Sequence, residues 1–183
     1  LPGIMSREFE FCIGYSEPNA GTDLASLETR ATRDGDDWVI NGQKIWTSNA
    51  QNATHIWLAA RTDPKAPKHR GISMFIIPMG TPGISVRAIP MAAGGRTNEV
   101  FFEDVGVPVA NRVGEENNGW YVAMTLLDFE RSNVASIAAN QGTLELLAGY
   151  ARKNRPGGAY AAVLRHRIAD MWIANVTGRL LSY

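Results

Sequence analysis

The chain has 183 residues, of which 45% are hydrophobic, and its 18 basic residues balance 18 acidic ones. A chain of this size can bury a core in one or two domains, and no stretch reaches the roughly 18 consecutive apolar residues of a membrane span. A net charge of zero excludes a broad electrostatic attraction to nucleic acid or to a membrane surface. The single cysteine, Cys12, excludes an internal disulfide and a multi-cysteine metal site.

The first part of the chain, to about residue 111, alternates short β-type runs with turn residues, which is typical of a β-barrel or a two-sheet sandwich. We expect strands over residues 27–33, 55–61, 72–78, 84–89 and 99–103. The pair Asn41-Gly42, set between apolar runs, predicts a two-residue hairpin. No G-x-G-x-x-G run follows a strand and opens a helix, so a nucleotide here would bind without a Rossmann fold.

The second part has a helical period. One helix is expected from Asn118 to about Lys153, with Pro156 and the glycines after it as the stop signal. A second helix follows, and its apolar face comprises Leu164, Ile168, Met171, Trp172, Val176 and Leu180. We expect this face to pack against helices outside the 183 residues. The sequence therefore predicts an α+β fold with a β domain over residues 1–113 and the opening of a helical bundle over 114–183.

Two segments have residue types suited to ligand binding. The segment 14–23 is rich in glycine and small hydroxyls, so its backbone N–H groups could approach a ligand closely. The segment 46–49 puts the indole of Trp46 beside hydroxyl and amide groups, which suits a flat heteroaromatic cofactor. From the residues alone, a structural turn at the first segment and a core tryptophan at the second remain the favoured interpretations.

Four landmarks in order resemble the acyl-CoA dehydrogenase family. Residues 15–23, Y-S-E-P-N-A-G-T-D, are similar to its T/S-E-P-x-A-G-S/T-D segment, and residues 41–49, N-G-Q-K-I-W-T-S-N, to its N-G-x-K-x-W-I-T/S-N. Residues 102–108 look like F-E/D-D-V-x-V-P, and Gly114 with Gly119-Trp120 looks like the entry into the last domain's first helix. The resemblance covers about residues 14–149 and implies the family's middle β domain and the start of its C-terminal helical domain.

The resemblance implies a flavoprotein whose β domain holds the isoalloxazine ring of FAD and one side of an acyl-CoA thioester. The residues carried over to the flavin are Tyr15, Ser16, Gly21, Thr22, Trp46, Thr47 and Ser48. Of these, Trp46 would lie against the ring, Thr47 and Ser48 near flavin N5, and Thr22 also along the pantetheine path. Ser48 is expected to donate its hydroxyl to N5.

Removal of an α-proton from a thioester needs a carboxylate, and Glu130 is the expected base. Its neighbours at helical spacing include Leu126, Leu127 and Val134, which would desolvate the carboxylate and raise its pKa. On composition alone a plain helix residue would be favoured. The L-x-x-E-R segment is similar to the isovaleryl-CoA and long-chain branches, which have their catalytic glutamate at this place, whereas other branches place it beyond residue 183.

Asp128 and Arg131 are expected to contact the CoA portion or to brace Glu130, with a simple i, i+3 ion pair as the equal alternative. The family's R-x-x-F-G and H-x-Q contacts to FAD across a subunit interface have no match here, although Arg155 would still reach a pyrophosphate. The three histidines lack the spacing of a metal site with acidic or cysteine partners, so no metal is expected.

The resulting expectation is an FAD-dependent α,β-dehydrogenase of acyl-CoA that passes electrons to an electron-transferring flavoprotein and forms a homo- or hetero-oligomer. A chain that starts without Met is expected to be a piece of a longer protein, inactive alone, and no targeting segment is visible, which favours a cytoplasmic location. The alternatives are an acyl-CoA oxidase or related flavin monooxygenase, and a non-catalytic subunit of a heteromeric dehydrogenase.

Overall fold

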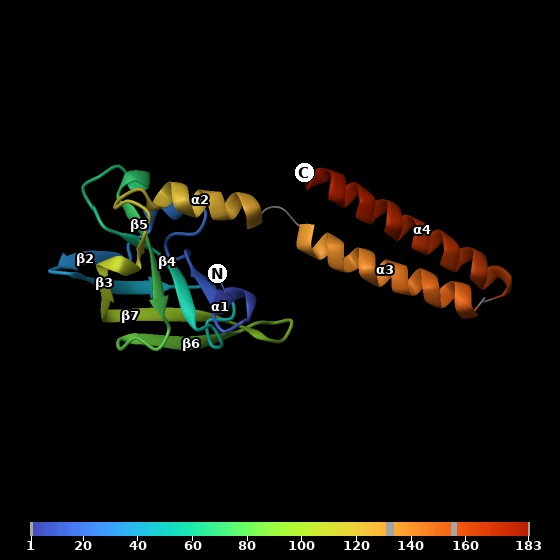
Figure 1. Ribbon diagram of the computed structural model, residues 1–183, viewed down its shortest axis with the longest axis horizontal. Helices are drawn as coiled ribbons and strands as arrows, with labels where there is room; N and C mark the ends of the chain where they lie inside the picture. Colours follow the sequence, from blue (N-terminus) through green and yellow to red (C-terminus); the bar gives the residue numbers. More distant parts are fainter. Residues whose placement is uncertain (1, 131–133, 155–156, 183) are drawn as a thin grey trace. The chain divides into compact units, whose positions relative to one another are not determined.

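The computed structural model describes residues 2–130, 134–154 and 157–182, and it divides into two compact units, Leu1–Thr125 and Leu126–Tyr183 (Figure 1). The units are described separately. The domain boundary expected after residue 113 stays a prediction, because a compact unit is defined by which residues pack together and not by where a domain begins. Before residue 119 the elements are α1 (Pro2–Met5), β1 (Phe11–Gly14), β2 (Arg30–Asp34), β3 (Asp37–Lys44), β4 (His55–Arg61), β5 (Ile72–Pro78), β6 (Ile84–Pro90), β7 (Arg96–Pro108) and β8 (Arg112–Val113).

The described strands form one eight-stranded sheet in the order β6-β7-β3-β2-β4-β5-β8, with β1 paired to β4. Most neighbours are antiparallel, but β1 and β2 each run parallel to β4. The α+β class is therefore confirmed, with a sheet that is mixed rather than wholly antiparallel. The strands expected at 55–61 and 72–78 coincide with β4 and β5, whereas β1 and β8 were not expected.

The hairpin predicted at Asn41-Gly42 is wrong, because β3 runs straight through this pair. The turn between β2 and β3 lies instead between Asp34 and Asp37, the last pair of the ladder, with Gly35 at a φ of 57°. The register between β3 and β7 shifts between Ile40 and Gly42, so β7 has a bulge there. The Asn-Gly pair thus lies within β3, opposite a bulge in β7, and not in a turn.

The two residues of the pair have different structural roles, Asn41 at the bulge and Gly42 at a close approach to Thr29. Asp104 on β7 has a φ of 48°, and the Asn41 side chain holds it by donating to its carboxylate at 2.9 Å and accepting from its N–H at 2.9 Å. Gly42 has a φ of 150°, and a Cβ there would lie 2.7 Å from the Cα of Thr29. Only glycine allows this close approach of two backbones.

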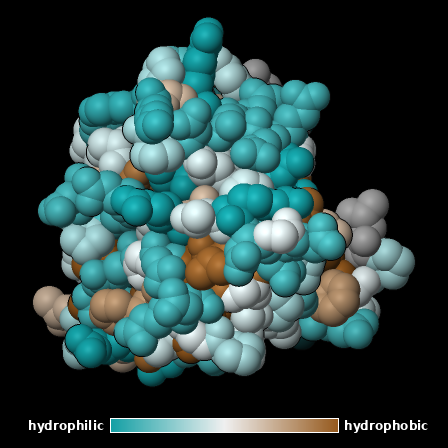
Figure 2. All heavy atoms as spheres, turned by 90° about the vertical axis from the view of Figure 1, so that its left-hand side faces the viewer, coloured by the Kyte–Doolittle hydropathy of each residue, from teal (hydrophilic) through white to brown (hydrophobic). Residues whose placement is uncertain are grey.

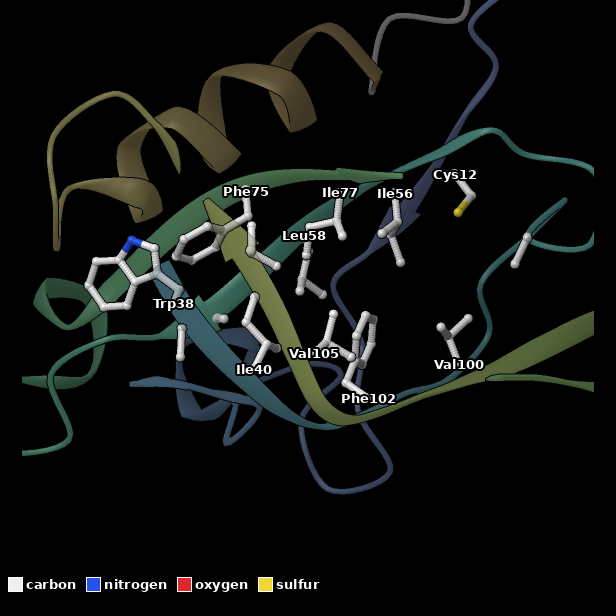
Figure 3. Packing of buried hydrophobic residues seen from close by; sticks show 14 of the residues in the cluster. Cys12, Trp38, Ile40, Ile56, Leu58, Phe75, Ile77, Val100, Phe102 and Val105 are labelled. Carbon is white, nitrogen blue, oxygen red and sulfur yellow. The ribbon is translucent and has the colours of Figure 1, made fainter. Parts of the chain in front are cut away.

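The core lies where the sheet folds over itself, between side chains of β3 and β7 and those of β4 and β5 (Figure 3). Trp38 and Phe75 meet edge to face, with ring centroids 5.6 Å apart. The same cluster contains the fully buried side chains Ile40, Ile56, Leu58, Ile77, Val100 and Val105. The outer face near β2 and β3 is mainly hydrophilic (Figure 2).

Three helices follow the sheet: α2 (Gly119–Glu130), α3 (Val134–Asn154) and α4 (Gly158–Leu181). The single helix expected from 118 to 153 is therefore described as two, and residues 131–133 between them lie outside the described part. α2 starts against the sheet, since a Cβ on Gly119 would lie 2.6 Å from the Cα of Ser73. None of the described helices has the length and apolarity to cross a membrane.

Candidate functional site

The loop after β1 and the segment after β3 lie side by side in the first unit. The N–H of Ile45 donates to the carbonyl of Ser16 at 2.9 Å, and the Lys44 ammonium donates to the carbonyl of Tyr15 at 3.0 Å. The buried phenol of Tyr15 accepts a hydrogen bond from the indole N–H of Trp57 at 2.9 Å. The two segments that the sequence singled out are therefore parts of one arrangement.

A buried ion pair holds this arrangement. The Lys44 ammonium is fully buried and lies 2.7 Å from the Glu17 carboxylate, which is itself almost wholly buried. Glu17 also accepts backbone hydrogen bonds from Glu28 at 2.6 Å and from Thr29 at 2.9 Å. One carboxylate thus joins the loop after β1, the segment before β2 and the end of β3, and its hydrogen bonds offset the cost of burying charge.

Burial acts on both partners of the pair. It raises the pKa of Glu17, but the Lys44 charge and the hydrogen bonds that the carboxylate accepts outweigh burial and bring this pKa below its ordinary value. Burial lowers the pKa of Lys44 to about 8, against the opposing effect of the Glu17 carboxylate. At neutral pH both groups are charged, so the pair is an ion pair under working conditions.

Trp46 follows this buried pair and points away from the core. Its side chain is 60% exposed and its φ is 60°, in the left-handed region that bulky residues seldom occupy. The chain then returns to β7, where the N–H of Thr47 donates to the carbonyl of Asn98 at 2.9 Å. The Asn98 amide in turn donates to the Thr47 carbonyl at 2.9 Å.

Several polar groups near Trp46 are suited to a ligand. The Thr47 hydroxyl is buried and has no hydrogen-bond partner among the described residues. The Ser48 side chain is exposed. On the loop after β1, Gly21 and Thr22 are exposed, and a Cβ on Gly21 would meet no atom within 4 Å. The first unit therefore has an outward indole followed in sequence by the hydroxyls of Thr47 and Ser48, and an open glycine on the loop after β1. A flat heteroaromatic ligand can use these groups.

Of the residues expected to act on the substrate, Thr22 lies in the first unit, whereas Glu130 and Asp128 lie in the second. Glu130 is exposed at the C-terminal end of α2, after half-buried Leu126 and Leu127 and beside Phe129, which is 76% exposed. Asp128 is also exposed. Arg131 and Arg155 lie outside the described part of the chain. The roles assigned to all these residues stay predictions.

Three residues of this arrangement were not expected from the sequence: Glu17, Lys44 and Asn98. Glu17 and Lys44 stand inside the two landmark segments, but no local pattern shows that a lysine in a strand points inward to an acid 27 residues away. Asn98 stands outside both segments. Burial also raises the pKa of the Cys12 thiol to about 11, which keeps the thiol protonated at neutral pH.

Comparison with known proteins yields two family models. Residues 12–105 match the model described as "Acyl-CoA dehydrogenase, middle domain", and residues 117–183 match "Acyl-CoA dehydrogenase, C-terminal domain". "Acyl-CoA dehydrogenase FadE26" of Mycobacterium tuberculosis is 48% identical over 161 residues, which are 86% of this chain and 40% of that protein. Mitochondrial "Isovaleryl-CoA dehydrogenase" of Pongo abelii is 36% identical, over all of this chain and 40% of that protein.

Solved structures show the same likeness. A "Tcur3481-Tcur3483 steroid ACAD G363A variant" has a TM-score of 0.82 at 43% identity and covers 99% of this chain and 47% of its own. The "ChsE4-ChsE5 complex from Mycobacterium tuberculosis" has a TM-score of 0.77 at 43% identity, covering 100% and 48%. The chain thus spans less than half the length of these relatives.

Proposed function

Because the chain belongs to the acyl-CoA dehydrogenase family, we propose that the complete protein catalyses the FAD-dependent α,β-dehydrogenation of an acyl-CoA thioester. The observation that supports this most strongly is the end of β3, where a strained, outward Trp46 is followed by the orphan hydroxyl of Thr47 and the exposed hydroxyl of Ser48. A backbone outlier with unpaired donors beside it is typical of a binding site.

These residues fit a flavin. The Trp46 indole gives a flat apolar surface for the ring, and the hydroxyls of Thr47 and Ser48 give donors at its edge. Tyr15 and Ser16 would line the same side of the flavin ring as the loop after β1, and Gly21 leaves room for close approach of the ligand. FAD, when bound, supplies the acceptor for the β-hydride of the substrate. Ser48 would donate its hydroxyl at the N5 edge and stabilise the charge that arrives there.

Glu130 is proposed as the base that takes the α-proton of the thioester, with Thr22, Asp128 and Arg131 along the path of the CoA portion. Leu126, Leu127 and Phe129 give it an apolar flank. The described residues leave Glu130 exposed, so the remaining desolvation that a base requires must come from the substrate and from further protein.

The direct test uses the complete protein, purified and assayed with acyl-CoA. The wild type is expected to be yellow, to lose its flavin absorbance under anaerobic acyl-CoA, and to turn over with an artificial acceptor. Glu130→Gln should lower kcat by about 100-fold or more, the usual contribution of a positioned base. Glu145→Gln, the same change at an exposed position of α3, is the control and should leave kcat unchanged.

The same preparation separates the rivals. Rapid reoxidation of the bleached flavin by air would favour an oxidase or monooxygenase, and slow reoxidation the dehydrogenase. A colourless protein without turnover would favour a non-catalytic subunit. Wild-type turnover in Glu130→Gln would remove Glu130 as the base.

A second test addresses the cofactor site through Gly21. Within the chain a side chain at this position meets only open space, so Gly21→Val should leave the free energy of unfolding nearly unchanged. Flavin content per chain should nevertheless fall, because the valine would occupy the space left for the ligand. Unchanged flavin content would remove Gly21 from the site.

Partners follow from the same family relationship. We propose a homo- or hetero-oligomer, for which the two-component titles of the structural relatives give a precedent, and an electron-transferring flavoprotein as acceptor. Since one relative is titled a "steroid ACAD", assays should include a steroid acyl-CoA beside straight-chain and branched substrates. Size measurement and electron transfer from the reduced protein test these partners. The cytoplasmic location stays a prediction, which cell fractionation tests.

A further inference from the structure

Trp46 is the one aromatic residue with a positive φ in the described part of the chain; the others outside glycine are Arg7, Asn49, Asp104 and Asn117. Asparagine and aspartate tolerate this conformation, because their short side chains can hydrogen-bond locally, but a bulky indole does not. Such strain persists only where the surroundings hold it. The contacts on either side of Trp46 must therefore hold its backbone in this conformation.

Before Trp46 the chain is fixed by β3. Lys44 pairs with Val100 in the ladder to β7, and its ammonium is locked in the buried pair with Glu17. After Trp46 the chain is fixed by one residue of β7. Asn98 joins Thr47 by two hydrogen bonds, one through its own carbonyl and one through its side-chain amide, each 2.9 Å long.

The amide of Asn98 has a second contact, since it also donates to the Gln51 side chain at 2.7 Å. Asn98 is fully buried, so these donors replace water for the carbonyls that they reach. Without them the Thr47 carbonyl would lose its partner, and the chain could relax toward an ordinary negative φ at Trp46. That relaxation would turn the indole away from its outward position.

We propose that Asn98 is a positioning residue: its side-chain amide holds Thr47 so that Trp46 keeps its left-handed backbone and presents its indole beside Ser48. This inference rests on the proposed function, since it assigns Asn98 to the same flavin site. Asn98 acts through Thr47 and Trp46, and it needs no contact of its own with flavin or substrate.

The test is Asn98→Asp in the complete protein, because this change keeps the shape of the side chain and removes both amide donors. A carboxylate oxygen would then face the Thr47 carbonyl and repel it. A misplacement of about 1 Å can cost on the order of 100-fold in rate, so we expect kcat to fall at least about 10-fold. KM should change much less, and the visible flavin spectrum should shift.

Asn52→Asp is the matched control. Asn52 lies exposed in the same segment and donates only to Asn49, so this variant should keep the wild-type kcat and spectrum. Wild-type kcat and an unshifted flavin spectrum in Asn98→Asp would overturn the inference. Asn98→Ala is the second variant in case the buried carboxylate prevents folding, and the same two outcomes decide it.

Two further measurements separate this inference from its premise. In a Trp46→Gly background, where no side chain remains to be positioned and the left-handed backbone is free of strain, Asn98→Ala should lower kcat much less than in the wild type. An equal loss in both backgrounds would overturn the role. The second measurement uses flavin-free protein. The fluorescence of Trp46 is identified as the part of the tryptophan emission that Trp46→Phe removes, and its quenching by acrylamide should change in Asn98→Ala. This measurement can be made even if the wild type is colourless, a result that would contradict only the proposed function.

Discussion

The two compact units differ in where they put their apolar side chains. The β unit buries Trp38 and Phe75 together with aliphatic side chains such as Ile40 and Leu58 in one core. In the helical unit the described buried hydrophobics are Ile137 and Leu144, whereas α4 exposes Trp172 and Leu180 among others. The first unit has a core built from its own side chains, and the second has an apolar face that the described residues do not cover.

This difference explains which region can build a precise site from its own residues. A closed core fixes the strand ends, so the segment around Trp46 has one conformation set by buried contacts at Lys44 and Asn98. Glu130 lies at the end of α2, where residues 126–130 are half-buried or exposed, so fewer buried contacts fix its side chain. Substitutions in the two units should therefore change the free energy of unfolding by different amounts.

The largest effect is expected in the core. Phe75→Ala removes a fully buried ring and its edge-to-face contact with Trp38, and it should lower the free energy of unfolding by about 3–5 kcal/mol. Phe129→Ala makes the same change at a side chain that is 76% exposed, and it should cost less than about 0.5 kcal/mol. Denaturant unfolding measures both. Similar losses at the two positions would contradict the contrast.

The buried pair should give the next effect. Glu17→Gln leaves the Lys44 charge buried without a counter-charge and should cost about 3 kcal/mol, as for a broken buried pair. Glutamine has one acceptor oxygen where the carboxylate has two, so it can keep the hydrogen bond from Glu28 or the one from Thr29, which reach different carboxylate oxygens. The double variant Glu17→Gln, Lys44→Met removes both charges and should recover most of the loss. A double variant that is as unstable as the single one would show that the charge is not the cause.

The pH dependence follows from the same carboxylate. The pKa of Glu17 in the folded chain lies below its ordinary value of 4.5, so the unfolded chain binds the proton more readily. The stability that Glu17 contributes is therefore fully present above pH 4.5 and is lost as the pH falls through the folded pKa. The double variant lacks this group, and its free energy of unfolding should decline less between pH 5 and pH 3. Parallel curves for the two proteins would contradict the assignment.

Sequence reasoning succeeded where one local signal determines the structure. The apolar runs of β4 and β5 fixed their own limits, and the landmark segments led to the family that the comparisons confirm. It failed at Asn41-Gly42, because the same pair suits a hairpin turn and a bulge, and only the partner Asp104, 63 residues away, decides between them. It missed Asn98 for the same reason, since a single asparagine in a strand has no local signal of its role.

The bulge gives a smaller, specific effect. Asn41→Ala removes two hydrogen bonds to Asp104, and because Asn41 is exposed, water replaces part of what is lost. We expect a cost of about 1 kcal/mol. Asn52→Ala, at an exposed asparagine with one local hydrogen bond, is the control and should cost less than about 0.5 kcal/mol. Equal values would mean that the side chain of Asn41 does not hold the bulge.

The smallest effect on stability is expected on the open face of α4. Leu180 is 72% exposed, and lysine has nearly the helix propensity of leucine, so Leu180→Lys in the 183-residue chain should change the free energy of unfolding by less than about 0.5 kcal/mol. The same change should reduce self-association in light scattering, because it interrupts an exposed apolar surface with a charge. A stability loss above about 1 kcal/mol would show that Leu180 is covered in solution, and the contrast between the two units would then fail at the helical unit.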